Sequence, residues 1–210
     1  MVTKVVTPPT GEPLIGGTVR LDPSVESDAP GLFAALDDPR VYTSGFGGGP
    51  AGRPGSAEHW ARSIRSSAAA TDRMSYTVRL VADSDLGAAG QIIGTSSLGD
   101  ILLEHGLVHL GWTGYSPAVW GTSVNAECKY LLLRHAFEDC GFGRVKIQTD
   151  SINERSQRAI AKLGATREGV LRRHRVRADG TFRDTVVFSI LDTEWPRVRD
   201  GLLERLGRTG

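Results

Sequence analysis

One segment of the chain, from Trp112 to Glu127, joins an apolar strand pattern to a long amphipathic helix through a short loop. The loop contains Pro117 and Gly121, which interrupt regular structure and set where the helix begins. The first N–H groups of a helix have no partner within the helix, and the helix dipole adds partial positive charge there. Such a junction can bind an anion without a dedicated Lys or Arg. The segment therefore predicts a ligand that carries phosphate.

The length of the chain sets the expected domain organisation. Its 210 residues, 40% of them hydrophobic, are enough for one core. Residues 1–16 are rich in Pro, Thr and Gly, so we expect a flexible N-terminal arm followed by a single domain over residues 17–210. The sequence has neither a signal-peptide apolar region nor an apolar run of about eighteen residues. We therefore expect a cytoplasmic protein with no membrane partner.

Charge and cysteine content narrow the expected partners and redox state. Lys and Arg number 25 against 24 Asp and Glu, which gives a formal net charge of +1. No overall field favours nucleic acid, so we expect no direct nucleic-acid binding. Cys128 and Cys140 fall in one predicted helix, about 18 Å apart along its axis, which is too far for a disulfide. We expect both to be reduced thiols in the core.

Hydrophobic periodicity predicts helices and strands that alternate through the middle of the chain. Ser27 or Asp28 is the expected cap of the first helix, and Asp179-Gly180 is a strong hairpin turn signal between the last two strands. This order predicts an α/β (α+β) fold with one mixed, mainly antiparallel sheet flanked by helices, and not a doubly wound sheet. The predicted helices cover residues 28–36, 57–70, 124–140, 153–163 and 195–206, and the predicted strands cover residues 18–22, 75–82, 91–101, 106–115, 144–149, 165–175 and 181–191.

A glycine-rich stretch, residues 45–55, superficially resembles a phosphate-binding loop. No strand pattern leads directly into it, and no Gly-Lys-Ser or Gly-Lys-Thr follows. We therefore interpret this stretch as a mobile lid or a linker.

Two longer segments carry a resemblance to a known family. The first is HLGWTGYSPAVWGTSVNAECKYLLLRHAFE; the second contains Asn153-x-x-Ser156, then Lys162-Leu-Gly-Ala-x-x-Glu168-Gly, a basic strand, a turn and Asp184. Several elements in one order and spacing are far more specific than one motif. Over residues 18–195 the chain resembles the GNAT acyl-CoA N-acyltransferases, in particular the RimJ/RimL-like, ribosomal-protein-alanine acetyltransferase branch. The resemblance implies the GNAT fold, acetyl-CoA as cofactor and acetyl transfer to an amine.

Members of that family hold the CoA pyrophosphate with the pattern Arg/Gln-x-x-Gly-x-Gly/Ala at the start of the long helix. Here Trp120 replaces the basic or amide residue, Ser123 the central glycine and Asn125 the small residue. Backbone N–H groups do most of the binding in such a loop, so the missing charge matters less than it first suggests. A Cβ at position 123 would obstruct the phosphate if φ there were positive. The resemblance implies that the pyrophosphate lies against Trp120, Gly121, Thr122, Ser123, Val124 and Asn125.

The resemblance also implies how the pantetheine arm is held. The edge of the strand that ends at Trp112 and Thr113 would pair with the pantetheine amides as a peptide adds to a sheet. One of those N–H groups would also stabilise the oxyanion that develops on the thioester. Asn153 is the family's usual hydrogen-bond partner for the arm. Plain helix capping is the alternative role of Asn153, and both roles can hold at once.

Acid and base candidates follow from the chemistry of amine acylation. Attack requires a neutral amine, and the departing thiolate benefits from a proton. Many family members use a Tyr as that acid, but Ile160 occupies the equivalent position here. Ser156 is then the candidate acid, with capping support as its alternative role. The candidate bases, besides a chain of waters, are Glu127, Glu168, His174 and Asp184.

The four candidate bases differ in environment. Glu127 lies in the first turn of a helix, where the dipole favours a carboxylate whatever its function. Glu168 belongs to the family's Glu-Gly motif, while His174 lies among arginines that lower its pKa. We take Ser156, Glu168 and Glu127 forward as the predicted catalytic residues.

Alternatives to the enzyme hypothesis stay open. The basic strand of residues 165–175 suggests RNA or a ribosomal surface, although alternating Arg is more often solvated. A catalytically silent GNAT-fold module that binds an acyl-CoA, or nothing, would explain the altered loop and the missing Tyr. For the enzyme, the acceptor is a protein or peptide N-terminus or a small-molecule amine such as an amino sugar. Trp112, Tyr115 and Trp120 are candidates for an aromatic wall, and tryptophan-bearing strands favour a homodimer.

Overall fold

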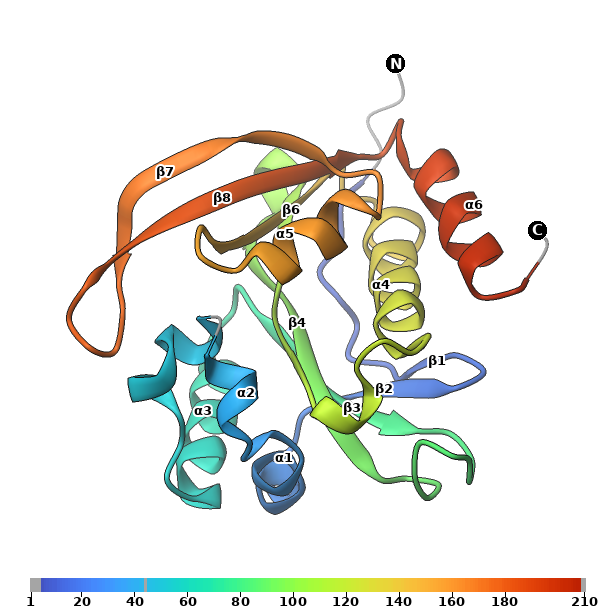
Figure 1. Cartoon of the computed structure of the whole chain (residues 1–210). Coiled ribbons are helices and arrows are strands. Elements are labelled where there is room, and N and C mark those ends of the chain that lie inside the picture. Colours follow the sequence, from blue (N-terminus) through green and yellow to red (C-terminus); the bar gives the residue numbers. More distant parts are fainter. Residues whose placement is uncertain (1–4, 44, 209–210) are drawn as a thin grey trace.

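The computed structural model describes residues 5–43 and 45–208, and its centre is one eight-stranded sheet (Figure 1). The strands follow the order β1-β2-β3-β4-β5-β6-β8-β7, and every neighbouring pair is antiparallel except β5 and β6. The expected mixed, mainly antiparallel sheet is therefore confirmed. The strands are β1 (Leu14–Ile15), β2 (Val19–Pro23), β3 (Met74–Leu80), β4 (Ile92–Leu102), β5 (Leu107–Tyr115), β6 (Arg144–Asp150), β7 (Thr166–Val176) and β8 (Phe182–Leu191).

Helices cover both faces of the sheet, and the alternation of side chains along β3 shows which helix covers which face. Tyr76, Val78 and Leu80 belong to the larger core, which also contains the apolar side of α4 and α6. Thr77 lies between them in sequence and donates a 2.8 Å hydrogen bond to Asp28, at the start of α1. Since successive side chains of a strand point to opposite faces, α4 and α6 lie on one face and α1 and α3 on the other. The helices are α1 (Ala29–Leu36), α2 (Pro39–Tyr42), α3 (Ala57–Ala69), α4 (Val124–Arg134), α5 (Glu154–Ala161) and α6 (Trp195–Arg205).

The sheet opens between its two parallel strands. β5 and β6 pair only over Leu107–His109 and Arg144–Lys146, after which β5 pairs with β4 alone. A β-bulge lies in the diverging part of β5, where Trp112 and Thr113 together oppose the single residue Ser96. Trp112 has φ of 50°, a left-handed conformation that bulky residues rarely adopt and that concentrates at functional sites. The bulge and the short parallel pairing leave a gap in the sheet beside the start of α4.

The segment of residues 5–16 differs from the expected flexible arm. Leu14 pairs with Leu21 as part of β1 and is only 5% exposed. The Thr7 N–H donates to the Cys140 carbonyl at 2.9 Å, so the segment is attached to the body of the protein before β1 begins. A strand of two residues has no periodicity that a sequence pattern can detect. Residues 1–4, the rest of the expected arm, lie outside the described residues.

The long helix predicted over residues 124–140 is confirmed in position, but not in the exposure of one residue. α4 continues into a π-helical segment, His135–Asp139, so the two together nearly span the predicted range. The helical periodicity places Lys129 on the polar face, where a side chain is expected to be exposed. In the structure Lys129 is only 6% exposed. Cys128 and Cys140 are buried and form no disulfide within the described chain. Among the described helices, none is long and apolar enough to cross a membrane.

Candidate active site

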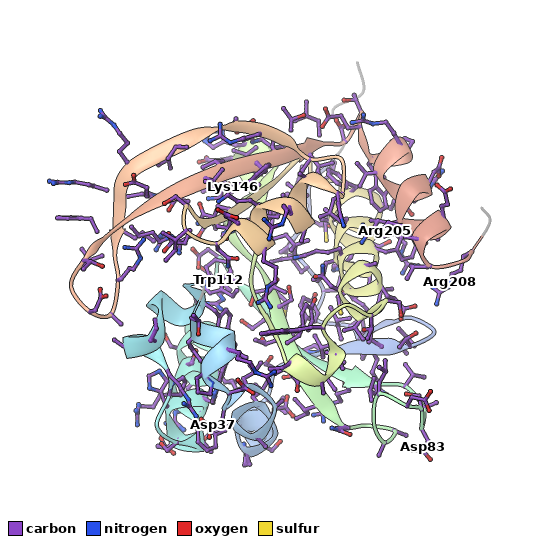
Figure 2. The ribbon with its side chains drawn as sticks, viewed as in Figure 1. Asp37, Asp83, Trp112, Lys146, Arg205 and Arg208 are labelled. Atoms are coloured by element: carbon purple, nitrogen blue, oxygen red, sulfur yellow. The ribbon has the colours of Figure 1, made fainter. Side chains whose placement is uncertain are left out.

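A cavity of about 620 Å³ opens where β5 leaves β6. Its walls come from β5, the start of α4, α5 and the helices α1 to α3, with the β7–β8 hairpin at one end. This volume is in the range of small-molecule and cofactor sites. Figure 2 shows Trp112, at the bulge of β5, in the space between α2 and α3 on one side and the hairpin on the other. Segments that are far apart in the sequence therefore meet around one hollow.

The cavity brings together most of the residues that the sequence predicts for cofactor binding. Thr122, Ser123 and Val124 lie in the same turn but do not line the cavity with the others. The Thr122 hydroxyl donates to the Val119 carbonyl at 2.7 Å and accepts from the Val124 N–H at 3.3 Å. These bonds hold the loop in shape. The predicted residues that line the cavity are Trp112, Thr113, Trp120, Gly121, Asn125, Asn153 and Ser156.

The loop before α4 has the free donors that a phosphate needs. Within the described chain, the N–H groups of Gly121, Thr122 and Ser123 have no hydrogen-bond partner. Gly121 has φ of 78°, which requires glycine, and a Cβ there would meet nothing within 4 Å. Ser123 has φ of −69°, so its side chain does not produce the obstruction that a positive φ would cause. The altered loop therefore keeps the geometry of an anion site.

A cation also lies beside this loop, although position 120 lacks one. The Trp120 indole N–H donates to the Tyr115 carbonyl at 3.0 Å, which fixes the ring against β5. The Arg155 guanidinium, from α5, lies 3.8 Å from the centroid of that ring and lines the cavity. Burial lowers the pKa of Arg155, but a guanidinium stays charged at any physiological pH. Arg155 thus places a positive charge beside Trp120, the position at which the family pattern has Arg or Gln.

Asn153 and Ser156 lie at the start of α5. The Asn153 side-chain oxygen accepts a 2.9 Å hydrogen bond from the Ser156 N–H, so the capping role of Asn153 is present. Its amide nitrogen remains available to a ligand, since both residues line the cavity. The Ser156 hydroxyl has no partner within the described chain. Ile160 also lines the cavity from the same helix.

The carboxylates predicted as catalytic lie outside the cavity. Glu127 is completely buried and accepts from the N–H groups of Gly17, Thr18 and Val19 at 2.8 to 2.9 Å, with Arg208 as a further partner. Burial raises the pKa of the Glu127 carboxyl, but these donors outweigh burial and hold the pKa below its usual range. The carboxylate therefore anchors the start of β2 to α4.

Glu168 has a similar structural role at the edge of the sheet. Arg144 donates to its carboxylate at 2.6 Å, and the Ser189 hydroxyl donates at 2.8 Å. The Arg144 guanidinium holds the pKa of Glu168 below its usual range. Asp184 accepts from the Arg173 N–H at 2.7 Å, and His174 contacts the Thr185 hydroxyl at 3.1 Å. None of Glu127, Glu168, His174 and Asp184 lines the cavity.

His109, which the sequence did not single out, lies inside the cavity on β5. Its ring is 4% exposed, and Nδ1 is 3.2 Å from an Asp100 oxygen that also accepts from Lys146. Burial lowers the pKa of His109, so the ring is neutral near pH 7. Its Nε2 has no hydrogen-bond partner among the described residues and lies beside Gly111 of the same strand, where an added Cβ would be 2.6 Å away. A neutral imidazole with a free nitrogen is a suitable proton acceptor.

Lys129 is a second buried group of the cavity that the sequence did not predict. Its amine donates to the Thr113 hydroxyl at 3.1 Å, and that hydroxyl also contacts the Ser96 hydroxyl at 2.7 Å. Burial lowers the pKa of Lys129 to about 8. Because α4 crosses the open part of the sheet, a residue on its polar face is covered by the cavity walls and not by solvent.

This arrangement defines a class of protein: an enzyme that binds a phosphate-bearing cofactor in an opened, mainly antiparallel sheet. Residues 18–166 match the acetyltransferase (GNAT) domain. The chain therefore belongs to the GNAT acetyltransferase family, whose members are acyltransferases that use acetyl-CoA.

Known proteins agree with this assignment. The chain is similar to an acetyltransferase from T. thermophilus, with 35% identity, a TM-score of 0.78 and coverage of 93% of this chain and 97% of that one. It is 29% identical to the uncharacterised N-acetyltransferase YoaA of Bacillus subtilis over 48% of this chain and 56% of that protein, so the match spans about half of YoaA. Mycobacterium smegmatis RimJ, in complex with CoA-disulfide, shares the fold, with 18% identity, a TM-score of 0.71 and coverage of 94% of each chain.

Proposed function

We propose that this protein transfers an acetyl group from acetyl-CoA to a primary amine by direct attack within a ternary complex. The observation that carries the proposal is the set of unpartnered N–H groups at Gly121, Thr122 and Ser123, in a loop that meets the cavity at Gly121 and lies beside Arg155. Three consecutive free donors and a guanidinium are suited to a pyrophosphate. Bound acetyl-CoA would supply a thioester, whose acetyl carbon the amine attacks as the carbon–sulfur bond breaks.

The open edge of β5 would hold the pantetheine arm. Beyond His109, no described strand pairs with β5 on the side of β6, so its N–H groups on that side, and the carbonyls other than that of Tyr115, are open to amides. The Asn153 amide would add one hydrogen bond from α5. A free N–H near the bulge at Trp112 and Thr113 would stabilise negative charge on the acetyl oxygen.

Two groups of the chain would move the protons. His109 Nε2, neutral and unpartnered, would accept the proton that the amine loses. The Asp100 carboxylate beside Nδ1 would stabilise the imidazolium that forms. Ser156, whose hydroxyl is unpartnered, would donate a proton to the departing sulfur. We do not retain Glu127 and Glu168 in this role, since both lie outside the cavity and their carboxylates are taken by other partners.

The acceptor and the branch of the family are part of the proposal. Likeness to RimJ supports the RimJ/RimL-like branch at the level of the fold, and a peptide N-terminus or a small amine remains the proposed acceptor class. A catalytically silent module is the competing hypothesis. The buried side-chain donors that line the cavity without a partner, such as Trp60 Nε1 and Arg73 Nε, argue against a module that binds nothing, because it would leave them unpaired.

A binding and a turnover experiment together test the proposal. CoA should raise the melting temperature of the protein, and acetyl-CoA should release thiol with at least one of a panel of small amines and N-terminal peptides. Arg155→Gln should weaken the CoA shift. His109→Gln should lower kcat about 100-fold with the CoA shift intact, while His174→Gln, the same change outside the cavity, should leave kcat unaltered. Binding without thiol release on every acceptor would favour the silent module.

A further inference from the structure

The cavity contains more positive charge than a pyrophosphate at the loop before α4 would require. Arg155 lies at the pyrophosphate loop, whereas Arg73, Arg175 and Arg183 line the cavity from the residue before β3, from β7 and from β8. Asp150 is the one acidic side chain among the described residues that line it. Three guanidiniums facing one carboxylate leave a strong positive field inside a partly enclosed space.

Arg73 has no carboxylate partner. Its guanidinium lies 4.0 Å from the centroid of the Trp112 ring and makes a single long contact, 3.4 Å, with the Ser97 hydroxyl. Its Nε is buried without any hydrogen-bond partner. Asp72 and Asp100 are near enough to favour its charged form, but neither forms an ion pair with it. Asp100 is occupied by Lys146 and His109.

Arg183 is unsatisfied in the same way at the hairpin. Its Nε is buried with no hydrogen-bond partner, and the nearest acidic oxygen, on Asp150, is 3.9 Å away. Both oxygens of Asp150 are already bonded by Arg177, at 2.8 and 2.9 Å. Arg175 lies directly opposite Arg183 on β7, so the two like charges repel each other, and the nearby Asp150 carboxylate is already bonded by Arg177.

Two neutral side chains with unpaired polar groups also line the cavity. The Trp60 indole N–H, from α3, and the Tyr42 hydroxyl, from α2, line the cavity and have no partner within the described chain. Burial raises the pKa of Tyr42 to about 12, so its hydroxyl keeps its proton. Buried polar groups are nearly always paired in a native protein, and Trp60 Nε1, Arg73 Nε and Arg183 Nε can only donate. A ligand group that accepts hydrogen bonds and carries negative charge would satisfy these donors and the charge of the guanidiniums.

From these groups we infer that the acceptor is a small amine that also bears a carboxylate, as an amino acid does, and that Arg73 binds this carboxylate. The inference rests on the proposed acetyl transfer. A guanidinium presents two parallel N–H groups that match the two oxygens of a carboxylate. Arg73 lies against Trp112, whose ring is 4.8 Å from that of His109, so a carboxylate at Arg73 would place the amine of a short molecule near the proposed proton acceptor.

The experiment compares ligands that differ only in the carboxylate. In the first arm, thermal shift with CoA present measures binding of N-acetyl amino acids, the expected products, against their N-acetyl amides. In the second arm, thiol release measures kcat/KM for the free amino acids and the amino-acid amides, at equal concentrations of neutral amine. We expect at least a tenfold preference for the carboxylate in both arms. Equal or better binding of the amides would overturn the inference.

Variants connect the preference to Arg73. Arg73→Gln should reduce the preference for the carboxylate at least fivefold, through KM, with the CoA shift unaltered. Arg73→Lys should restore part of it. Arg172→Gln, an exposed arginine of β7 outside the cavity, is the matched control and should keep the full preference. A weaker CoA shift in Arg73→Gln, with the carboxylate preference retained, would assign that residue to the cofactor and overturn its role here.

The two arms separate this inference from the proposed function. Carboxylate-selective binding without thiol release on any amine would contradict acetyl transfer and leave the anion site standing. Thiol release with amines that lack a carboxylate, and no selective binding, would support acetyl transfer and contradict the anion site.

Discussion

Replacing Lys129 by Met should make the free protein more stable at neutral pH. Lys129 is 6% exposed, and its pKa falls from an ordinary value of 10.5 to about 8 because burial penalises the charge. A pKa change of one corresponds to about 1.4 kcal/mol, so keeping the amine charged at pH 7 costs about 3 kcal/mol. Losing its hydrogen bond to Thr113 costs about 1 kcal/mol. The expected net gain in the free energy of unfolding is about 2 kcal/mol.

The pKa shift of Lys129 also predicts how the difference in stability between the two proteins changes with pH. The folded pKa of Lys129 lies below the unfolded one, so between pH 8 and 10.5 the unfolded chain binds more protons than the folded chain. Stability of the wild type therefore rises with pH across that window, and this rise is absent in the Met variant. The difference between the two proteins should shrink by about 2 kcal/mol from pH 7 to pH 9.5.

Urea unfolding of both proteins at several pH values, without CoA, measures this difference. Comparing the two proteins at each pH cancels the titration of every other group. Lys162→Met, at an exposed lysine, is the matched control and should show no such trend. A difference between wild type and Lys129→Met that stays constant from pH 7 to 9.5 would refute the reasoning, since Lys129 would then titrate as it does in the unfolded chain.

Three further predictions concern the anchors around the cavity. Glu127→Ala should lower the free energy of unfolding by about 3 kcal/mol, because three backbone donors and Arg208 lose their acceptor; denaturant titration measures the loss, and an unchanged midpoint would count against it. Asn153→Ala should weaken CoA binding or turnover markedly while loss of the α5 cap costs about 1 kcal/mol, and wild-type kinetics would argue against the site. Gly111→Ala should lower kcat with CoA affinity retained, since the new Cβ would displace His109; unaltered kcat would show that the ring is not needed where it lies.

Much of the fold follows from local pattern. The predicted helix over residues 57–70 corresponds to α3 (Ala57–Ala69), and the turn at Asp179-Gly180 joins β7 to β8 as expected. Such elements depend on side chains a few residues apart, which a single sequence contains in full. β1 was not predicted, because a strand of two residues is too short to show a period, and the helix predicted to Cys140 gave no sign that its last turn is π-helical.

The residues of the candidate site also fall into two groups: some have a local sequence signal and some depend on distant contacts. Gly121 and Asn153 were identified by spacing, since a loop that opens a helix and a helix cap are local features. Glu127 was taken for a catalytic base on equally local grounds, and its true partners, Gly17 to Val19, lie more than a hundred residues away. No local pattern records such a contact.

The sequence by itself therefore determined the order of helices and strands, the position of the loop-to-helix junction before α4 and the family to which these motifs point. Only the tertiary structure decided that Lys129 is buried, that His109 faces a cavity with a free nitrogen, and that Arg73 has no acidic partner among the described residues. The physical reason is that burial and hydrogen-bond satisfaction depend on which distant segments meet, and here they meet where β5 separates from β6.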